Sequence, residues 1–137
     1  MTRLINFYRI NEAFYLVDLP GFGYAKAGHA DKELMEIALK AYFDATQTLK
    51  GVLYLVDPRV PNSAVDHAAL EWILNGGHPL QVVAARADQL AKSELSKAMM
   101  EIRKNHGLPE LPLPVSSFKK TGLDQLWEQL MPLVVMG

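Results

Sequence analysis

The sequence predicts an α/β fold with a doubly wound, mostly parallel sheet and one antiparallel strand at its edge. Short apolar runs alternate along the chain with segments in which apolar residues recur at helical spacing. The apolar runs are continuous rather than alternating, which is typical of strands covered by helices on both faces. Connections between such parallel strands are expected to be right-handed crossovers.

Five strands are expected, and the first two form a hairpin. Their connection through Asn11-Glu12 is short enough for an antiparallel turn. The last candidate is short and broken by prolines. In chain order the expected strands are Arg3 to Ile10, Phe14 to Val17, Val52 to Val56, Leu80 to Ala84, and Leu113-Pro114-Val115.

Four helices are expected in the intervals, with capping residues at their starts and glycines at their ends. Ser63 opens the second with a pattern that resembles a capping box, and Thr121 opens the fourth. Gly51, Gly76 and Gly107 end the first three. The two tryptophans are expected in the core. The apolar stripes comprise Leu34, Ile37, Ala38, Ala41, Tyr42 and Ala45; Trp72 and Ile73; Leu95, Met99 and Ile102; and Leu123, Leu126, Trp127 and Leu130.

Composition limits the class of protein. The 137 residues fit a single domain, residues 1–137, with 50% apolar residues. The 14 basic and 15 acidic side chains nearly cancel, so net charge shows no basic surface for nucleic acid. The absence of cysteine excludes disulfides and thiolate metal sites. No apolar stretch approaches the roughly 18 residues of a membrane span, and no signal peptide precedes the first strand. We therefore expect a cytoplasmic domain with no membrane partner.

A first marked loop, Asp18-Leu19-Pro20-Gly21, follows the Phe14 to Val17 strand. In P-loop NTPases an Asp at this place holds Mg²⁺ through water, and the Gly N–H faces the terminal phosphate. Such a site also needs a Gly-rich loop that ends in Gly-Lys-Ser/Thr and cradles the phosphates. The sequence contains no such loop.

Two further loops are expected at the same edge, because ligands bind beyond the carboxyl ends of the strands in open α/β sheets. Arg86-Ala87-Asp88 follows one strand, and its carboxylate can accept two hydrogen bonds from a guanine edge. Val115-Ser116-Ser117 follows the next, and its backbone N–H groups can meet the guanine oxygen. An Asp after a strand is commonly a loop residue or a helix cap, so one such loop alone does not indicate a nucleotide site. The prediction of a guanine site depends on the order and spacing of the three loops together.

In these motifs the sequence resembles the EngB (YihA/YsxC-type) GTPases of ribosome biogenesis. The matching segments follow one another in order over essentially the whole chain, and the segment from Asp18 to Lys26 is specific to this family among GTPases. The matches are Leu4-Ile5-Asn6-Phe7, Tyr15 to Lys26, Leu53 to Arg59, Ala87-Asp88-Gln89-Leu90, and Ser116 to Gly122.

The resemblance implies a GTP/GDP-binding protein that assists assembly of the large ribosomal subunit and is linked to cell division and septation. It implies that Thr2 and Asp18 hold Mg²⁺, and that Asp18-Leu19-Pro20-Gly21 faces the γ-phosphate. It further implies that Asp88 reads the guanine within Ala85-Arg86-Ala87-Asp88, that Arg86 lies along the base, and that Val115-Ser116-Ser117 closes the pocket.

The chain departs from the family pattern in three places. The phosphate loop, its strand and its helix are absent, so the fold is expected to lack these elements. The family's Thr-Lys before the base-reading pair is Ala85-Arg86, and Arg86 can still stack on a base. Phe22 stands where Ras-like proteins keep a water-orienting Gln; a hydrophobic residue is usual there in the family that the chain resembles, so only slow intrinsic hydrolysis is implied.

The missing strand has a structural consequence. In this fold it lies between the Phe14–Val17 and Val52–Val56 strands, so its loss leaves their N–H and C=O groups without partners. Either the two strands pair directly or their edges stay open. We expect in-frame codons upstream of Met1 to encode a Gly-x-x-x-x-Gly-Lys-Ser/Thr loop, and an in-frame stop there would refute this.

Two other interpretations remain open at this stage. The chain can be a fragment or interaction module that does not hold nucleotide. It can also be an unrelated receiver-type domain with Asp57 as phosphoacceptor, although the acidic pair and strand-end Lys of that class are not evident, and Asp57 fits a loop role better. The four histidines show no metal-ligand spacing and are expected at the surface or in caps.

Overall fold

The structure, a computed structural model, describes residues 6–19, 37 and 39–135. The chain divides into two compact units, Met1–Leu49 and Lys50–Gly137, which we describe separately. The two units differ in which residues contact one another, and this does not test the number of domains. A single domain over residues 1–137 stays a prediction.

The first unit contains the expected hairpin. Strands β1 (Asn6–Ile10) and β2 (Phe14–Asp18) pair antiparallel, with Asn6 opposite Asp18. Asn11 and Glu12 both have positive φ, and the Ala13 N–H donates to the Ile10 carbonyl at 2.9 Å. Two left-handed residues in succession give the turn whose twist matches paired strands. The part of the expected first strand before Asn6 lies outside the described residues.

The first expected helix is described over residues 39–45. Its inward side is buried at Leu39 and Phe43, which are 1% and 7% exposed. Neither residue belongs to the predicted stripe, and its members Ile37, Ala41 and Ala45 are exposed. The predicted buried face is therefore wrong here, because the larger apolar side chains of Leu39 and Phe43 bury more area than the alanines do.

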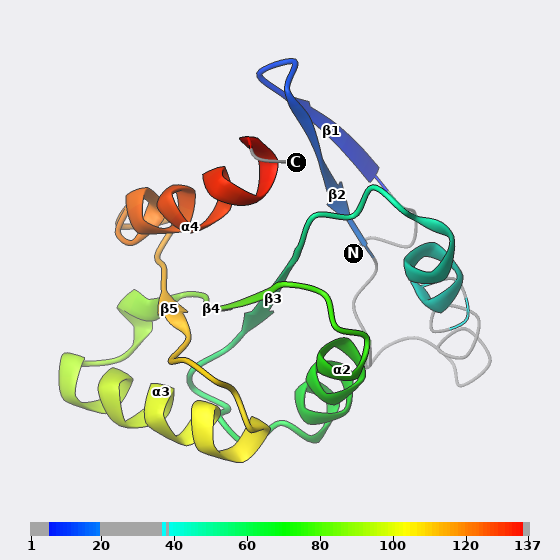
Figure 1. Ribbon diagram of the computed structural model, residues 1–137. Coiled ribbons are helices and arrows are strands. Elements are labelled where there is room, and N and C mark those ends of the chain that lie inside the picture. Colours follow the sequence, from blue (N-terminus) through cyan, green and yellow to red (C-terminus); the bar gives the residue numbers. More distant parts are fainter. Residues whose placement is uncertain (1–5, 20–36, 38, 136–137) are drawn as a thin grey trace. The chain divides into compact units, whose positions relative to one another are not determined.

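The second unit contains a parallel α/β sheet whose two crossover helices lie on the same side (Figure 1), so the double winding predicted from the sequence is not seen within this unit. Strands β3 (Val52–Val56), β4 (Leu80–Ala84) and β5 (Leu113–Pro114) form a parallel sheet in that order. Helices α2 (Ala64–Asn75) and α3 (Lys92–His106) lie on one side of it, and α4 (Leu123–Val135) lies on the other (Figure 1). The strand and helix order predicted from the sequence is confirmed here.

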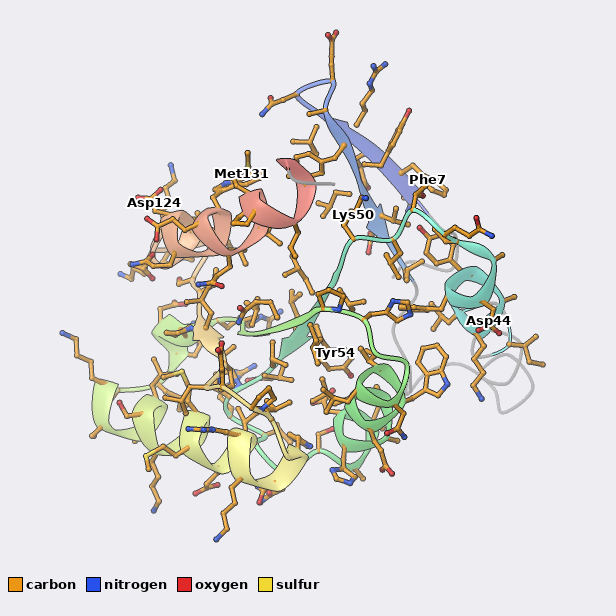
Figure 2. The ribbon with its side chains drawn as sticks, in the orientation of Figure 1. Phe7, Asp44, Lys50, Tyr54, Asp124 and Met131 are labelled. Carbon is orange, nitrogen blue, oxygen red and sulfur yellow. The ribbon has the colours of Figure 1, made fainter. Side chains whose placement is uncertain are left out.

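The main core lies between the sheet and the helices α2 and α3. Tyr54 reaches from β3 toward α2, and its hydroxyl donates to an Asp66 carboxylate oxygen at 2.7 Å (Figure 2). Burial and this bond raise the pKa of Tyr54 far above its ordinary value. The buried members of this core are Val56, Leu70, Val82, Ala84, Ile102 and Leu108.

The described strands form two sheets, whereas the sequence predicts one. β1 and β2 make a two-stranded sheet, and β3 is an edge strand of the three-stranded one. Leu55 on β3 is 62% exposed, although it belongs to a continuous apolar run. Such a run predicts cover on both faces, and the cover on this side of β3 is absent among the described residues.

Trp127 is a second difference, because it is 44% exposed and not in the core. The rest of the predicted stripe on α4, Leu123, Leu126 and Leu130, is only half-buried. The described sheet of the second unit has three strands, one of them only two residues long, so it is too narrow to cover the whole apolar face of the thirteen-residue helix α4. Part of that face is therefore not covered by this sheet.

Among the described residues, no helix has both the length and the apolar character that crossing a bilayer requires.

Candidate functional site

Backbone hydrogen bonds bring two of the predicted loops together at the carboxyl ends of β4 and β5. The Val115 N–H donates to the Ala84 carbonyl at 2.9 Å, and the Ala87 N–H donates to the Val115 carbonyl at 3.1 Å. The Ala85 N–H donates to the Val56 carbonyl of β3 at 2.9 Å. The loop after β4 is thus tied to both neighbouring strands, so its side chains start from fixed backbone positions.

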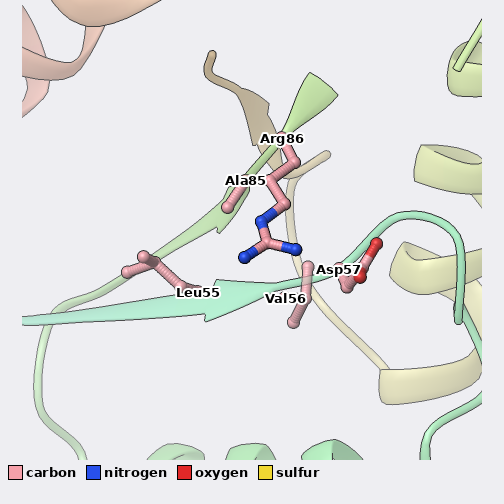
Figure 3. A pocket seen from close by; sticks show the side chains of 5 residues that line it. All are labelled: Leu55, Val56, Asp57, Ala85 and Arg86. Carbon is pink, nitrogen blue, oxygen red and sulfur yellow. The ribbon is translucent and has the colours of Figure 1, made fainter. Parts of the chain in front are cut away.

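Arg86 turns the chain between β4 and the short helix η1 (Ala87–Gln89). It has a left-handed backbone, φ 55°, which is uncommon for a residue with a Cβ atom. Its exposed side chain extends from the end of β4 toward the end of β3 (Figure 3). There it borders a cavity of about 340 Å³, lined also by Leu55, Val56, Asp57 and Ala85. The cavity lies where a ligand is expected in an open α/β sheet.

Asp88 and Ser116 form the polar centre of the site. The Ser116 hydroxyl donates to Asp88 Oδ1 at 2.7 Å and accepts from the Lys119 N–H at 3.0 Å. Ser116 is only 1% exposed, so its hydroxyl has few other orientations. The Ser116 bond lowers the pKa of Asp88, which keeps the carboxyl ionised and an acceptor. Asp88 Oδ2 accepts from the exposed Gln89 side chain at 3.2 Å.

A tight loop, residues 116–121, holds Ser116 in place. Ser116 and Thr121 exchange two backbone hydrogen bonds of 3.0 Å, and Ser117 is exposed between them. Gly122 follows with φ 78°, and a Cβ atom there would lie 2.2 Å from the Pro114 carbonyl oxygen. Only glycine allows the chain to pass so close to β5 on its way into α4.

The fold matches a solved structure described as the crystal structure of a probable GTP-binding protein engB. The TM-score is 0.85 at 12% sequence identity, over 100% of this chain and 86% of that one. No family model matches the chain.

Curated relatives described as "Probable GTP-binding protein EngB" are much more similar in sequence. The protein from Clostridioides difficile (strain 630) is 41% identical over 132 residues, and that from Alkaliphilus metalliredigens (strain QYMF) is 40% identical over 136. These alignments cover 95% and 98% of this chain and 65% of each relative. The protein from Syntrophomonas wolfei subsp. wolfei is 36% identical, and the chain covers 69% of it.

The chain belongs to the EngB family. The resemblance inferred from the sequence motifs is therefore confirmed, and the receiver-type interpretation is wrong. The chain spans about 65% of the length of the first relatives it matches, so what those whole proteins do is not thereby established for it.

The structure brings together one group of the predicted EngB site residues, and the other group lies elsewhere or outside the described range. Ala85 to Asp88 and Val115 to Ser117 lie together in the second unit. Asp18, which is exposed, and Leu19 belong to the first unit. Thr2, Pro20 and Gly21 lie outside the described residues. No group of three or more His, Cys, Asp or Glu side chains suited to a metal occurs among the residues that are described.

Asp57 has a loop role in this EngB chain. Its carboxylate accepts from Arg59 Nε at 3.0 Å, from Arg59 Nη2 at 2.7 Å and from the Arg59 N–H at 2.9 Å. These bonds lower the pKa of Asp57, and the charge of Arg86 adds to the effect. The carboxylate therefore supplies negative charge beside the Arg86 guanidinium at the cavity.

Two contributors to the site were missed by sequence reasoning. Asp57 was considered only as a loop residue or phosphoacceptor, and the Lys119 N–H was not considered at all. A Ser hydroxyl commonly accepts from the backbone N–H three residues later in a local turn. The spacing of Ser116 and Lys119 is the sequence feature that indicates this bond. The proximity of Asp57 to Arg86 had no sequence signal, because their loops follow different strands.

Proposed function

We propose that this chain carries the base-reading part of a GTP site and acts as a GTP/GDP-binding protein of the EngB type. The observation that carries the proposal is the ionised Asp88, held by the buried Ser116 hydroxyl with one carboxylate oxygen facing an exposed partner. Guanine presents two adjacent N–H donors on one edge. A carboxylate in a fixed orientation can accept a hydrogen bond from each of them. Ser116 keeps the orientation of Asp88, and the Gln89 amide is displaced by the base.

Arg86 provides the face of the base pocket in this proposal. A guanidinium is planar and stacks on aromatic rings, so Arg86 fulfils the role of the family's Lys at this place. Its left-handed backbone directs the side chain over the cavity at the ends of β3 and β4. Val115 and Ser117 complete the pocket with backbone groups and an exposed hydroxyl.

Thr2 and Asp18 would hold Mg²⁺, Thr2 through its hydroxyl and Asp18 through water. An Asp at the end of β2, followed by Leu19-Pro20-Gly21, supplies the hard oxygen chemistry that Mg²⁺ prefers. The ion would neutralise charge on the β- and γ-phosphates when nucleotide is bound. Family membership supports the further proposals that the partner is the large ribosomal subunit, that the role bears on cell division and septation, and that the protein is cytoplasmic.

The lack of a phosphate-loop sequence leaves a second candidate function, a nucleotide-incompetent module of the same fold. Nothing in the sequence supplies the backbone cradle and Lys that hold the phosphates. β3 has no partner on one side among the described strands, and this and the exposed Leu55 favour the proposal that a further strand, with its loop and helix, completes the sheet. Without those elements, guanine contacts alone would give weak binding.

A titration with a fluorescent GTP analogue, with and without Mg²⁺, tests the proposal. We expect saturable, Mg²⁺-dependent binding that Asp88→Ala weakens by at least about tenfold, since a charged hydrogen-bond partner contributes about 1.5–3 kcal/mol. Asp124→Ala is the matched control, because Asp124 is an exposed Asp in the first turn of α4. Absence of saturable binding would establish the incompetent module for this polypeptide.

A base exchange makes the test specific for guanine recognition. Asp88→Asn replaces one acceptor oxygen by a donor, so it should favour xanthine nucleotides, in which a carbonyl replaces the guanine amino group. We expect the ratio of affinities for GTP and XTP to reverse in this variant. If both nucleotides weaken equally, Asp88 supports the fold and does not read the base.

A further inference from the structure

Two histidines from different helices face each other on the side of the second unit that carries α2 and α3. His67 on α2 and His106, the last residue of α3, place their Nδ1 atoms 3.3 Å apart. Their ring centroids are 5.4 Å apart with an interplanar angle of 35°, so the rings meet by their nitrogen edges and do not stack. His106 is 7% exposed, whereas the His67 side chain is 53% exposed.

Oxygen acceptors lie near the second nitrogen of each ring. The His67 Nε2 atom lies 3.7 Å from a Glu71 carboxylate oxygen, one helical turn along α2. His106 bonds to the backbone of Pro61, which has no N–H, so the carbonyl accepts. Because Nδ1 of His106 faces His67, Nε2 is the nitrogen left to donate to Pro61. The Pro61 carbonyl holds the hydrogen of His106 on Nε2 and leaves the lone pair on its Nδ1. Glu71 lies beyond hydrogen-bond distance of His67, and its negative charge favours the tautomer with the hydrogen on Nε2.

When both rings carry their hydrogen on Nε2, the two Nδ1 lone pairs face each other and repel, and a cation between them removes the repulsion. In a tetrahedral zinc site with Zn–N bonds of about 2.0–2.1 Å, two ligand nitrogens lie about 3.3–3.4 Å apart. The observed separation of 3.3 Å fits such a site, and it also lies within the range of a hydrogen bond between the two nitrogens.

We propose that His67 and His106 bind a borderline divalent metal ion, Zn²⁺ or a cation of similar preference, between α2 and α3. Imidazole nitrogens select this class of ion over Mg²⁺ and Ca²⁺, which prefer oxygen. No third His, Cys, Asp or Glu ligand completes the group within the described residues, so water fills the remaining positions. The exposed side of His67 gives the ion access, and the carboxylates of Asp66 and Glu71 lower the cost of its charge.

The ion would act as a clamp on this layer of the fold. α2 and α3 carry part of the main core, through Leu70 and Ile102, but no disulfide or ion pair connects the two helices in the described part of the chain. A metal bound by one ligand from each helix binds only when the helices are packed. It therefore stabilises the folded state by mass action. This site is separate from the residues assigned to GTP and Mg²⁺.

Zinc titration of the tag-free, chelator-treated chain tests the proposal by calorimetry and thermal unfolding. We expect one Zn²⁺ per chain, a rise in Tm with zinc, and no competition by Mg²⁺. His67→Gln should weaken binding by about tenfold or more and abolish the Tm shift. His67 is exposed and Gln is a good helix former, so circular dichroism should show this variant folded. His78→Gln is the control and should bind zinc as the parent chain does.

Three results would overturn the proposal. One is no stoichiometric binding with zinc in large excess, which would mean that the pair shares an ordinary Nδ1–H···Nδ1 hydrogen bond. Another is unchanged binding in folded His67→Gln. The third is an equal loss in His78→Gln, which would assign the zinc to scattered surface histidines. Nitrogen NMR of the imidazoles distinguishes these, because zinc should shift the Nδ1 resonances of His67 and His106 together.

Discussion

At the scale of single residues, Ser116 connects the two loops of the candidate guanine site. It is almost fully buried, and its hydroxyl both donates to Asp88 and accepts from the Lys119 N–H. The sequence predicts that Asp88 and Ser116 belong to one site, because both follow strands of a parallel sheet. The hydrogen bond between them was not predicted, since it depends on the backbone bonds that set the Val115 segment beside Ala84 and Ala87.

The pKa of Asp88 gives a prediction at this scale. Ser116→Ala removes the main cause of the lowered pKa, so the pKa of Asp88 should rise toward its ordinary value of 3.8. A carboxyl with a lowered folded-state pKa adds stability above its unfolded pKa and loses it as the pH falls through the folded one. The stability difference between the parent and Ser116→Ala should therefore be full above pH 3.8 and shrink in more acid solution.

Carbon NMR of the Asp88 carboxyl group during a pH titration measures this shift directly. Ser117→Ala is the control, because Ser117 is the exposed neighbour of Ser116 in the same loop. An unchanged Asp88 pKa in Ser116→Ala would contradict the assigned cause.

At the scale of elements, the ends of α2 and α3 follow the sequence closely, whereas the first helix ends at residue 45 and not at the predicted Gly51. Ser63 caps α2 and accepts from the Asp66 N–H at 3.2 Å, as its sequence pattern predicts. Gly107 ends α3 in the left-handed conformation, as predicted for a C-terminal glycine. These agreements arise because caps depend on residues within one turn, so their signal is local in the chain.

The two N-caps give opposite predictions for stability. Ser63→Ala should lower the free energy of unfolding by about 1 kcal/mol, because it leaves a helix N–H without its acceptor. α3 begins at the exposed Ala91, which makes no side-chain cap bond. Ala91→Ser should therefore raise stability by about 0.5–1 kcal/mol. Urea unfolding measures the free energy of unfolding of both variants. A lower stability of Ala91→Ser than of the parent chain would show that the start of α3 does not tolerate an added hydroxyl.

Gly122 and Gly107 form a matched pair for backbone strain. Both have positive φ, but a Cβ atom at Gly107 meets nothing within 4 Å, whereas one at Gly122 meets the Pro114 carbonyl oxygen. Gly107→Ala should cost only the left-handed conformation, about 1–2 kcal/mol. Gly122→Ala should cost more than about 3 kcal/mol, the upper range for backbone strain alone. Equal losses in chemical unfolding would contradict the proposed close approach to β5.

Trp127 shows where element-scale reasoning is insufficient. The helical spacing correctly places Trp127 on the apolar face of α4, yet the residue is 44% exposed. Periodicity identifies the face of a helix, but the width of the sheet opposite decides how much of that face is covered.

At the scale of the whole molecule, the central observation is the division of the described strands into two sheets. The sequence predicts the strands and the antiparallel hairpin correctly. It also predicts the consequence of a missing central strand as either direct pairing or open edges. Within residues 6–19, 37 and 39–135, one edge of β3 has no strand partner, and Leu55 is exposed. Unpaired backbone groups on such an edge are costly and invite association with another strand.

The proposed missing segment gives the prediction at this scale. The test is a fusion to Met1 of a segment with an apolar strand, a Gly-x-x-x-x-Gly-Lys-Ser/Thr loop and a helix. Hydrogen exchange should then show stronger protection of the β3 amides, Val52–Val56, and GTP affinity should increase by at least about tenfold.

The loop lysine separates the structural effect from the nucleotide effect. Changing it to Ala in the fused chain should keep the β3 protection but lose most of the gain in GTP affinity. Unprotected β3 amides in the fused chain would mean that the added strand does not pair there, and the proposed completion of the sheet would be wrong.

The sequence by itself determined the secondary-structure order, the caps and the motifs that identify the EngB family, because each of these depends on neighbouring residues. The tertiary structure alone decided the separation into two sheets, the exposure of Trp127, the Ser116–Asp88 bond and the pairing of His67 with His106. These depend on which distant segments pack together. The physical reason is that periodicity and capping are local, whereas strand partners and side-chain contacts depend on the burial available in the folded chain.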